Sequence, residues 1–155
     1  MRLNTKLRKF TIYWLPVLLW MALIFGASSD RHSFTHSSRL IGPFVRWLFP
    51  LISDHALYRV IFGVRKVAHL TEYAILGALI WRALRKPARN DPRSWEWRQA
   101  RLALALVILY AASDEFHQAF VPTREASVVD VLIDTSGAAL GLGALWMAGR
   151  WRGRW

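Results

Sequence analysis

The chain contains no cysteine among its 155 residues. Disulfide bonds, thiolate chemistry and cysteine-ligated zinc are therefore excluded, although this absence does not identify a cellular compartment. Acidic residues are also scarce, ten against 21 Lys and Arg, which gives a net charge of +11. Nucleic-acid-binding proteins often carry such a charge, but here the basic residues flank apolar segments instead of forming one basic face. We therefore expect membrane lipids, and no nucleic acid, as partners.

Apolar residues are abundant: they make up 54% of the chain, which includes nine Trp and has a positive mean hydropathy. The length suits a single domain over residues 1–155. Four segments are long and apolar enough to cross a bilayer, at about residues 11–27, 67–84, 101–120 and 127–148. The sequence thus predicts an all-α fold, an integral membrane four-helix bundle. The first segment could alternatively be a signal peptide, but Pro16 interrupts its core and favours a retained anchor.

The stretch at residues 31–64 is a poor spanning segment because Arg46, Pro43 and Pro50 interrupt its apolar residues. Aromatic side chains such as Trp47 lie beside cationic ones, which is typical of helices in the plane of the membrane interface. We predict interfacial helices between spans one and two. The alternative is an irregular extramembrane loop.

The distribution of Lys and Arg predicts the orientation of the spans. The first ten residues carry four, residues 82–101 carry seven and the last seven residues carry three, whereas residues 121–126 carry one. Short segments rich in Lys and Arg stay in the cytoplasm, so four spans with both termini cytoplasmic fit this pattern. Residues 28–66 carry six over a longer stretch that this topology places outside.

With this topology the polar residues of the spans gather near the extracytoplasmic face. Five of the ten acidic residues lie in this region, and ionisable groups at such depth are costly in lipid. Positions three or four apart share one face of a helix, so each span presents one polar stripe to the bundle interior. Asp130 and Asp134 continue into Gly137 and Gly141, where a second helix backbone could approach closely. The residues expected to converge are Glu72, Asp114, Glu115, Gln118, Arg124 and Asp130, with Lys66 and His69 at the rim or wall.

Four ordered pieces of the sequence carry a resemblance to a known family. They are residues 66–73 (KVAHLTEY), 113–124 (SDEFHQAFVPTR), 127–138 (SVVDVLIDTSGA) and 25–29 (FGASS). Together they resemble the VanZ-like family of small bacterial membrane proteins, whose namesake is linked to resistance to the glycopeptide teicoplanin. The resemblance implies a multi-pass protein of the bacterial cytoplasmic membrane. Thr123 stands where the family usually has Gly, and Asp134 where it more often has Asn.

Several functions are compatible with these residues. The preferred one is a cell-envelope protein whose polar pocket handles a lipid-linked or glycopeptide-like ligand, linked to glycopeptide resistance. The alternatives are a membrane-embedded hydrolase or transferase, a structural or accessory bundle without a ligand, and a transporter, for which an internal repeat is lacking.

The residues divide by the role that their chemistry suits. The acid–base and catalytic candidates are His69, Glu72, Asp114 and Glu115. The ligand-binding candidates are Lys66, Tyr73, Gln118, Arg124, Asp130 and Asp134. No recognised metal-binding spacing is present, so no metal is predicted, and the sequence does not identify a cofactor. His117 lies off the Asp114–Gln118 line and is expected at an interface.

Overall fold

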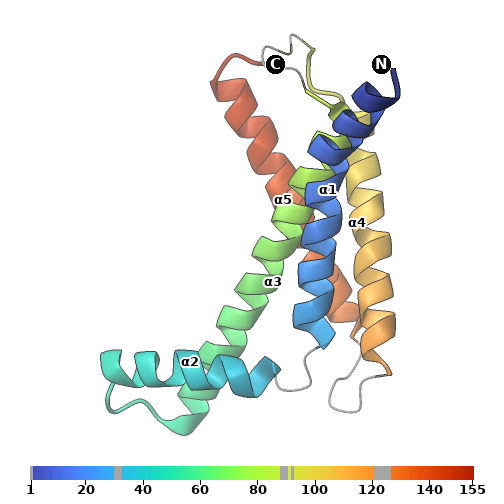
Figure 1. Cartoon of the computed structure of the whole chain (residues 1–155). Helices are drawn as coiled ribbons and strands as arrows, with labels where there is room; N and C mark the ends of the chain where they lie inside the picture. Colours follow the sequence, from blue (N-terminus) through green and yellow to red (C-terminus); the bar gives the residue numbers. More distant parts are fainter. Residues whose placement is uncertain (1, 30–32, 88–90, 92, 121–126) are drawn as a thin grey trace.

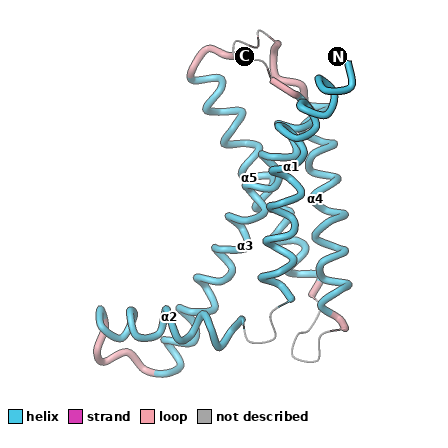
Figure 2. Tube along the Cα trace, viewed as in Figure 1, coloured by secondary structure: helices cyan, strands magenta, loops and turns pink. Residues whose placement is uncertain are grey.

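A computed structural model describes residues 2–29, 33–87, 91, 93–120 and 127–155. These residues form helices and no strand, as Figure 2 shows. The helices are α1 (Arg2–Ser29), α2 (Ser33–Leu48), α3 (Asp54–Arg85), α4 (Trp97–Gln118) and α5 (Val128–Trp151). The prediction of an all-α fold is confirmed for this part of the chain.

Four long helices run beside one another, while α2 lies across the end of the bundle (Figure 1). The chain ascends and descends in alternation, so both termini lie at the same end. Helix α3 is central, since it contacts each of the other four helices. The other four helices therefore pack around α3.

The bounds of α3 correct the sequence prediction. This helix begins at Asp54, well before the predicted start at residue 67, and is 32 residues long. Ser53 caps it, because its hydroxyl accepts a hydrogen bond from the Ala56 amide at 3.3 Å. No proline occurs between Pro50 and Pro87 to end it. Of the predicted interfacial helices, only α2 lies crosswise, and the stretch after Ser53 is continuous with the second span. For the described residues, the alternative of an irregular loop is wrong.

The remaining helix bounds differ less from the predicted spans. Helix α1 extends the first span at both ends, α4 begins four residues before residue 101, and α5 ends three residues after residue 148. At about 1.5 Å per residue, α3 is about 48 Å long, which exceeds a hydrocarbon core of about 30 Å. Part of α3 therefore extends beyond the thickness of a bilayer core.

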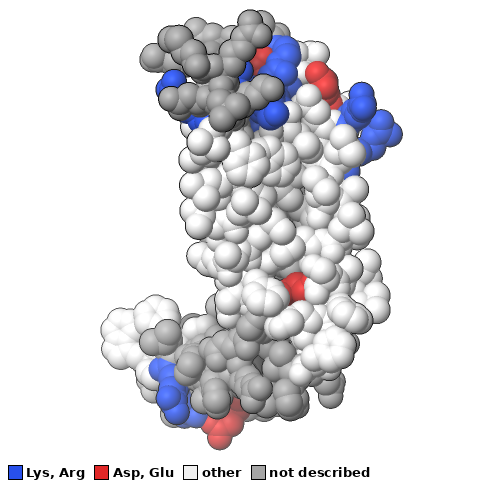
Figure 3. All heavy atoms as spheres, turned by 45° about the vertical axis from the view of Figure 1, so that its right-hand side comes forward, with Lys and Arg blue, Asp and Glu red and all other residues white. Residues whose placement is uncertain are grey.

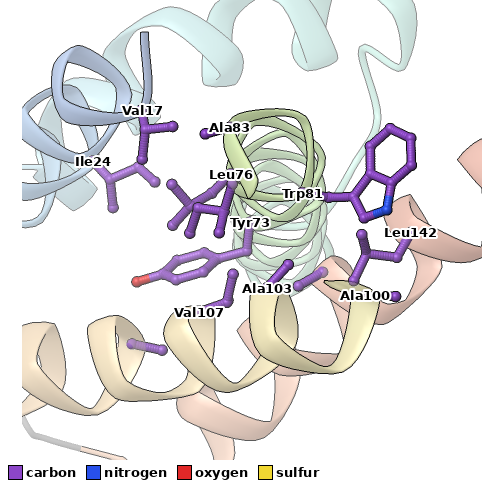
Figure 4. Close-up of a cluster of buried hydrophobic side chains, with 13 residues drawn as sticks. Val17, Ile24, Tyr73, Leu76, Trp81, Ala83, Ala100, Ala103, Val107 and Leu142 are labelled. Atoms are coloured by element: carbon purple, nitrogen blue, oxygen red, sulfur yellow. The ribbon is translucent and has the colours of Figure 1, made fainter. Parts of the chain in front are cut away.

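Small residues bring the helices close together. A Cβ atom on Gly141 would lie 2.6 Å from the Ala74 carbonyl oxygen, and one on Gly137 would lie 2.9 Å from the Leu70 Cα. Both glycines thus allow the α5 backbone to approach α3, as their spacing predicts. Figure 4 shows the buried core beside this contact. Its largest fully buried apolar side chains are Val17, Ile24, Tyr73, Leu76 and Val107.

The outer surface of the bundle is apolar. Large side chains of α1, α4 and α5 are exposed, among them Leu19 at 62%, Leu109 at 67% and Leu140 at 66%. Figure 3 shows charged atoms mainly toward the two ends of the face in view, with a band of mostly uncharged residues between them. Leu7–Ala27 and Val128–Trp151 are long and apolar enough to cross a membrane. Such a large apolar surface is typical of a membrane protein.

Candidate functional site

Two ion pairs join α3 to α5. The Lys66 Nζ atom lies 2.5 Å from the Asp130 Oδ1 atom, and both side chains are 26% exposed. One helical turn further along, the His69 Nδ1 atom lies 3.4 Å from the Asp134 Oδ1 atom. The Asp134 side chain is only 2% exposed, whereas that of His69 is 22% exposed. The sequence-predicted stripes of α3 and α5 therefore face each other.

Helix α4 adds buried polar side chains from its C-terminal turns. Asp114, Glu115 and Gln118 are all buried. The Gln118 amide donates a hydrogen bond to the Asp114 carboxylate at 3.0 Å, as their four-residue spacing allows. The Glu115 carboxylate accepts a hydrogen bond from the Ser127 backbone N–H at 2.8 Å. Because Ser127 is the N-cap of α5, Glu115 ties the end of α4 to the start of α5.

Glu72 lies three residues after His69 on α3. Its half-buried carboxylate interacts electrostatically with His69, Asp134 and Asp114. Its backbone carbonyl accepts a hydrogen bond from the Trp20 indole at 2.9 Å, which joins α1 to the same level of α3. Glu72 and Asp114 thus belong to one region and do not lie on opposite sides of the bundle.

We call these side chains the polar cluster. It comprises Lys66, His69, Glu72, Asp114, Glu115, Gln118, Asp130 and Asp134. Arg124, which the sequence predicts as a further member, lies outside the described residues, as does Asp30 at the end of α1. The described cluster holds five carboxylates against one lysine and one histidine. Protons or a cationic group must offset this excess of negative charge in a region of low dielectric constant.

Several polar atoms in and beside the cluster are buried and poorly satisfied by the described residues. The Tyr73 hydroxyl has no hydrogen-bond partner among them, and the His69 Nδ1 and Asp134 Oδ1 atoms face each other at a long 3.4 Å. Tyr73 is fully buried and borders the apolar core, with its ring centroid 6.2 Å from that of Tyr110 (Figure 4). Unsatisfied buried groups are rare in folded proteins and are frequent where a ligand or water binds. The cluster therefore has hydrogen-bonding capacity that the helices themselves do not use.

Two further sequence predictions concern a metal site and the position of His117. Within the described residues, no group of three or more His, Asp or Glu side chains is arranged to hold a metal ion. The His117 ring packs against Phe25 of α1, with centroids 4.5 Å apart, so it lies at a helix interface.

The sequence prediction did not identify the contacts that join α1 to the cluster. The Tyr110 hydroxyl donates to the carbonyl oxygen of Met21, the residue after Trp20, at 2.6 Å. A Trp or Tyr within a spanning segment usually finds a hydrogen-bond partner when buried. That preference was the available signal, but it does not specify which carbonyl group accepts.

Comparison with known proteins identifies the family. A search of curated proteins and a search of solved structures each found no match. The model of one family, described as VanZ/LLP1, matches residues 13–149. This range includes all four sequence pieces that carry the resemblance and every residue of the polar cluster. Membership fits a cell-envelope protein, in agreement with the apolar surface of the helices. The chain belongs to the VanZ/LLP1 family.

Proposed function

We propose that this protein is a multi-pass cell-envelope membrane protein whose polar cluster binds a lipid-linked or glycopeptide-like ligand at the extracytoplasmic face. The observation that carries the proposal is the set of buried, poorly satisfied polar atoms: the Tyr73 hydroxyl, without a partner among the described residues, and the His69 Nδ1 and Asp134 Oδ1 atoms, which face each other at 3.4 Å. Helix packing alone does not require such atoms, because an unsatisfied buried group costs about 1–3 kcal/mol. A bound ligand would supply the missing hydrogen bonds.

The proposed topology has four passes, formed by α1, α3, α4 and α5. Both termini lie at one end (Figure 1), and the basic segments at residues 2–9, 82–87, 93–101 and 150–154 belong to that end. Since segments rich in Lys and Arg stay in the cytoplasm, both termini would be cytoplasmic. The polar cluster would then lie toward the outer face of the bacterial cytoplasmic membrane.

Helix α2 supports the same placement at the outer end. It lies across the bundle (Figure 1) and exposes Phe44 at 60% and Trp47 at 74%. The loop between α2 and α3 adds Leu51, which is 99% exposed. Aromatic and aliphatic side chains beside Arg46 suit a helix that lies in the membrane interface. In this arrangement, α2 would lie in the outer headgroup region near the entrance to the polar cluster.

The charges of the cluster indicate the chemistry of the ligand. The excess of carboxylates favours a ligand with an ammonium group or several hydrogen-bond donors. The partly exposed Lys66 could in turn pair with an anionic group, such as a phosphate or a carboxylate. Lipid-linked cell-wall precursors and glycopeptides combine such groups, and the link of the family's namesake to teicoplanin resistance agrees with a ligand of this class.

A second candidate function is catalysis at the same cluster. The 3.4 Å approach of His69 to Asp134 resembles the pairing in which a carboxylate orients a histidine that acts as a general base. Glu72, near Asp114, would be the candidate general acid. The reaction would be hydrolysis or group transfer on a lipid-linked substrate.

One experiment separates these functions. Purified full-length protein is titrated with a lipid-linked cell-wall precursor and with teicoplanin, and bound ligand and products are followed by native mass spectrometry. A complex without product supports binding, and new product masses support catalysis. His69→Gln should weaken either result, whereas His55→Gln, an exposed histidine on the same helix, should not. If neither ligand binds or reacts, or if both variants behave alike, the proposal of a ligand site is wrong and a structural bundle remains.

A further inference from the structure

A second polar site lies at the opposite end of the bundle from α2, near both termini (Figure 1). A cavity of about 350 Å³ is formed there by the C-terminal ends of α3 and α5 and by the segment that follows α3. Its charged lining consists of Arg85, Arg152 and Arg154 against a single carboxylate, Asp91. We call this cavity the arginine–tryptophan pocket, because Trp81 and Trp155 also line it.

Arg85 is a fixed part of the pocket wall. Its side chain is 1% exposed and donates hydrogen bonds to the Asp91 carboxylate at 3.1 Å and the Ser94 carbonyl at 3.0 Å. The guanidinium carbon also lies over the rings of Trp81 and Trp155, 5.4 and 5.5 Å from their centroids. The guanidinium group of an arginine keeps its positive charge inside proteins.

Among the described residues, the pocket lining carries more positive than negative charge. Asp91 is shared, since it also pairs with Arg93 at 2.7 Å. Arg152 and Arg154 are exposed, and in the part of the chain that the structure describes no carboxylate pairs with them. Three arginines against one aspartate leave the pocket lining with an excess of two positive charges. This excess favours an anion.

The tryptophans place the pocket at the level of lipid headgroups. Trp95 stacks on Trp81 with centroids 4.8 Å apart and contacts Trp155 at 5.4 Å. Such aromatic clusters beside basic residues are typical of the membrane–water interface.

We propose that the arginine–tryptophan pocket binds the phosphate group of an anionic phospholipid from the membrane leaflet at the terminal end of the bundle. Guanidinium groups bind phosphate oxygens through paired N–H donors, and the apolar Leu145 and tryptophan walls suit the glycerol and first acyl carbons. Basic pockets between spanning helices commonly bind anionic headgroups. The inference does not depend on the polar cluster, which lies nearer the other end.

The test compares lipid binding by variants that remove equal charge. Delipidated full-length protein in neutral detergent is titrated with phosphatidylglycerol, phosphatidylcholine of the same acyl chains, and inorganic phosphate, and bound molecules are counted by native mass spectrometry. The pocket variant is Arg152→Gln/Arg154→Gln. The matched control is Arg98→Gln/Arg101→Gln, which removes two exposed arginines at the same end of the bundle. Thermal unfolding of both variants shows whether they retain the fold.

The proposal expects one tightly bound phosphatidylglycerol, with phosphatidylcholine bound more weakly. The pocket variant should lose about 25-fold in phosphatidylglycerol affinity, since each basic residue near an anionic headgroup contributes a factor of about five, while the control retains its affinity. Equal losses in the two variants would show unspecific surface attraction and overturn the proposal. Equal binding of the two lipids would also overturn it. Binding of inorganic phosphate with displacement of the lipid would assign the pocket to free phosphate instead.

Discussion

The Lys66 ammonium and the Asp130 carboxylate are each 26% exposed, so their interaction is only partly screened by water. The Arg46–Asp54 pair at the end of the bundle with α2 offers a comparison, because its side chains are 51% and 91% exposed. Exposed pairs contribute about 0–1 kcal/mol, whereas removal of one partner from a buried pair leaves an uncompensated charge. The two pairs should therefore differ in their contribution to stability.

We predict a coupling of about 1–2 kcal/mol between Lys66 and Asp130, within the range for contacting residues. The measurement is a double-mutant cycle with Lys66→Met, Asp130→Asn and the double variant, followed by unfolding in detergent. The same cycle with Arg46→Met and Asp54→Asn should give a smaller coupling. Equal coupling energies in the two cycles would show that the Lys66–Asp130 pair contributes no more to stability than an exposed pair, which would contradict the prediction.

Asp91, outside the spanning segments, makes the stability of the terminal end dependent on pH. Hydrogen bonds from Arg93 hold the pKa of the Asp91 carboxyl well below its usual range. A carboxyl whose pKa is lower in the folded protein stabilises the fold above its unfolded pKa, about 3.9. This stabilisation is lost as the pH falls further. Asp91→Asn should thus lower the Tm at pH 6, and the difference from the original protein should shrink below about pH 4.

The dependence on Arg93 provides a control for this prediction. In an Arg93→Gln background, Asp91→Asn should lower the Tm at pH 6 by a smaller amount, because the hydrogen bonds that lower the pKa of Asp91 are absent. Thermal unfolding between pH 3 and pH 6 checks both expectations. A Tm difference that stays constant over this range would show that Asp91 acts through packing and not through its charge.

The sequence predicted individual residues of the cluster better than those of the arginine–tryptophan pocket. Lys66, His69, Asp130 and Asp134 follow helical spacing, so their faces could be derived from two segments that each form one helix. The role of Arg85 could not be derived in this way. Its partners, Asp91 and the carbonyls of Arg93 and Ser94, lie in a segment without periodic structure, and such contacts depend on the path of the backbone.

At the scale of elements, the approach of α5 to α3 depends on glycine. Gly137→Ala or Gly141→Ala should lower the free energy of unfolding by about 1–3 kcal/mol, because an added methyl group would press on the α3 backbone. Gly143 lies on the same helix with no neighbouring atom within 4 Å of an added Cβ. Gly143→Ala should therefore be neutral or stabilise by up to about 1 kcal/mol. Unfolding in detergent measures all three variants.

A contrary result is easily recognised. If Gly137→Ala and Gly143→Ala changed stability equally, the glycines would act through helix propensity and not through contact with Leu70 and Ala74. The stripe of Asp130, Asp134, Gly137 and Gly141 allowed this close contact to be predicted from spacing. The full length of α3 was harder to predict, since Lys66 and Arg65 suggested a boundary where the helix in fact continues.

At the scale of the whole molecule, a band of mostly uncharged residues lies between two charged ends (Figure 3). The polar cluster is nearer the end with α2, and the arginine–tryptophan pocket is at the end with both termini. The cluster has an excess of carboxylates, while the pocket has an excess of arginines. If the protein crosses the membrane four times, the two sites would face different leaflets and bind ligands of different charge.

The orientation can be tested directly because the chain contains no cysteine. His55→Cys and Glu96→Cys each introduce one exposed thiol, near opposite ends of the bundle. In intact cells, a membrane-impermeant maleimide should label His55→Cys and should label Glu96→Cys only after permeabilisation, because basic segments stay cytoplasmic. The reverse pattern would invert the topology and place the polar cluster toward the cytoplasm. Labelling of both thiols in intact cells would show that residues 55 and 96 lie on the same side of the membrane. That result would contradict the prediction that α3 spans it.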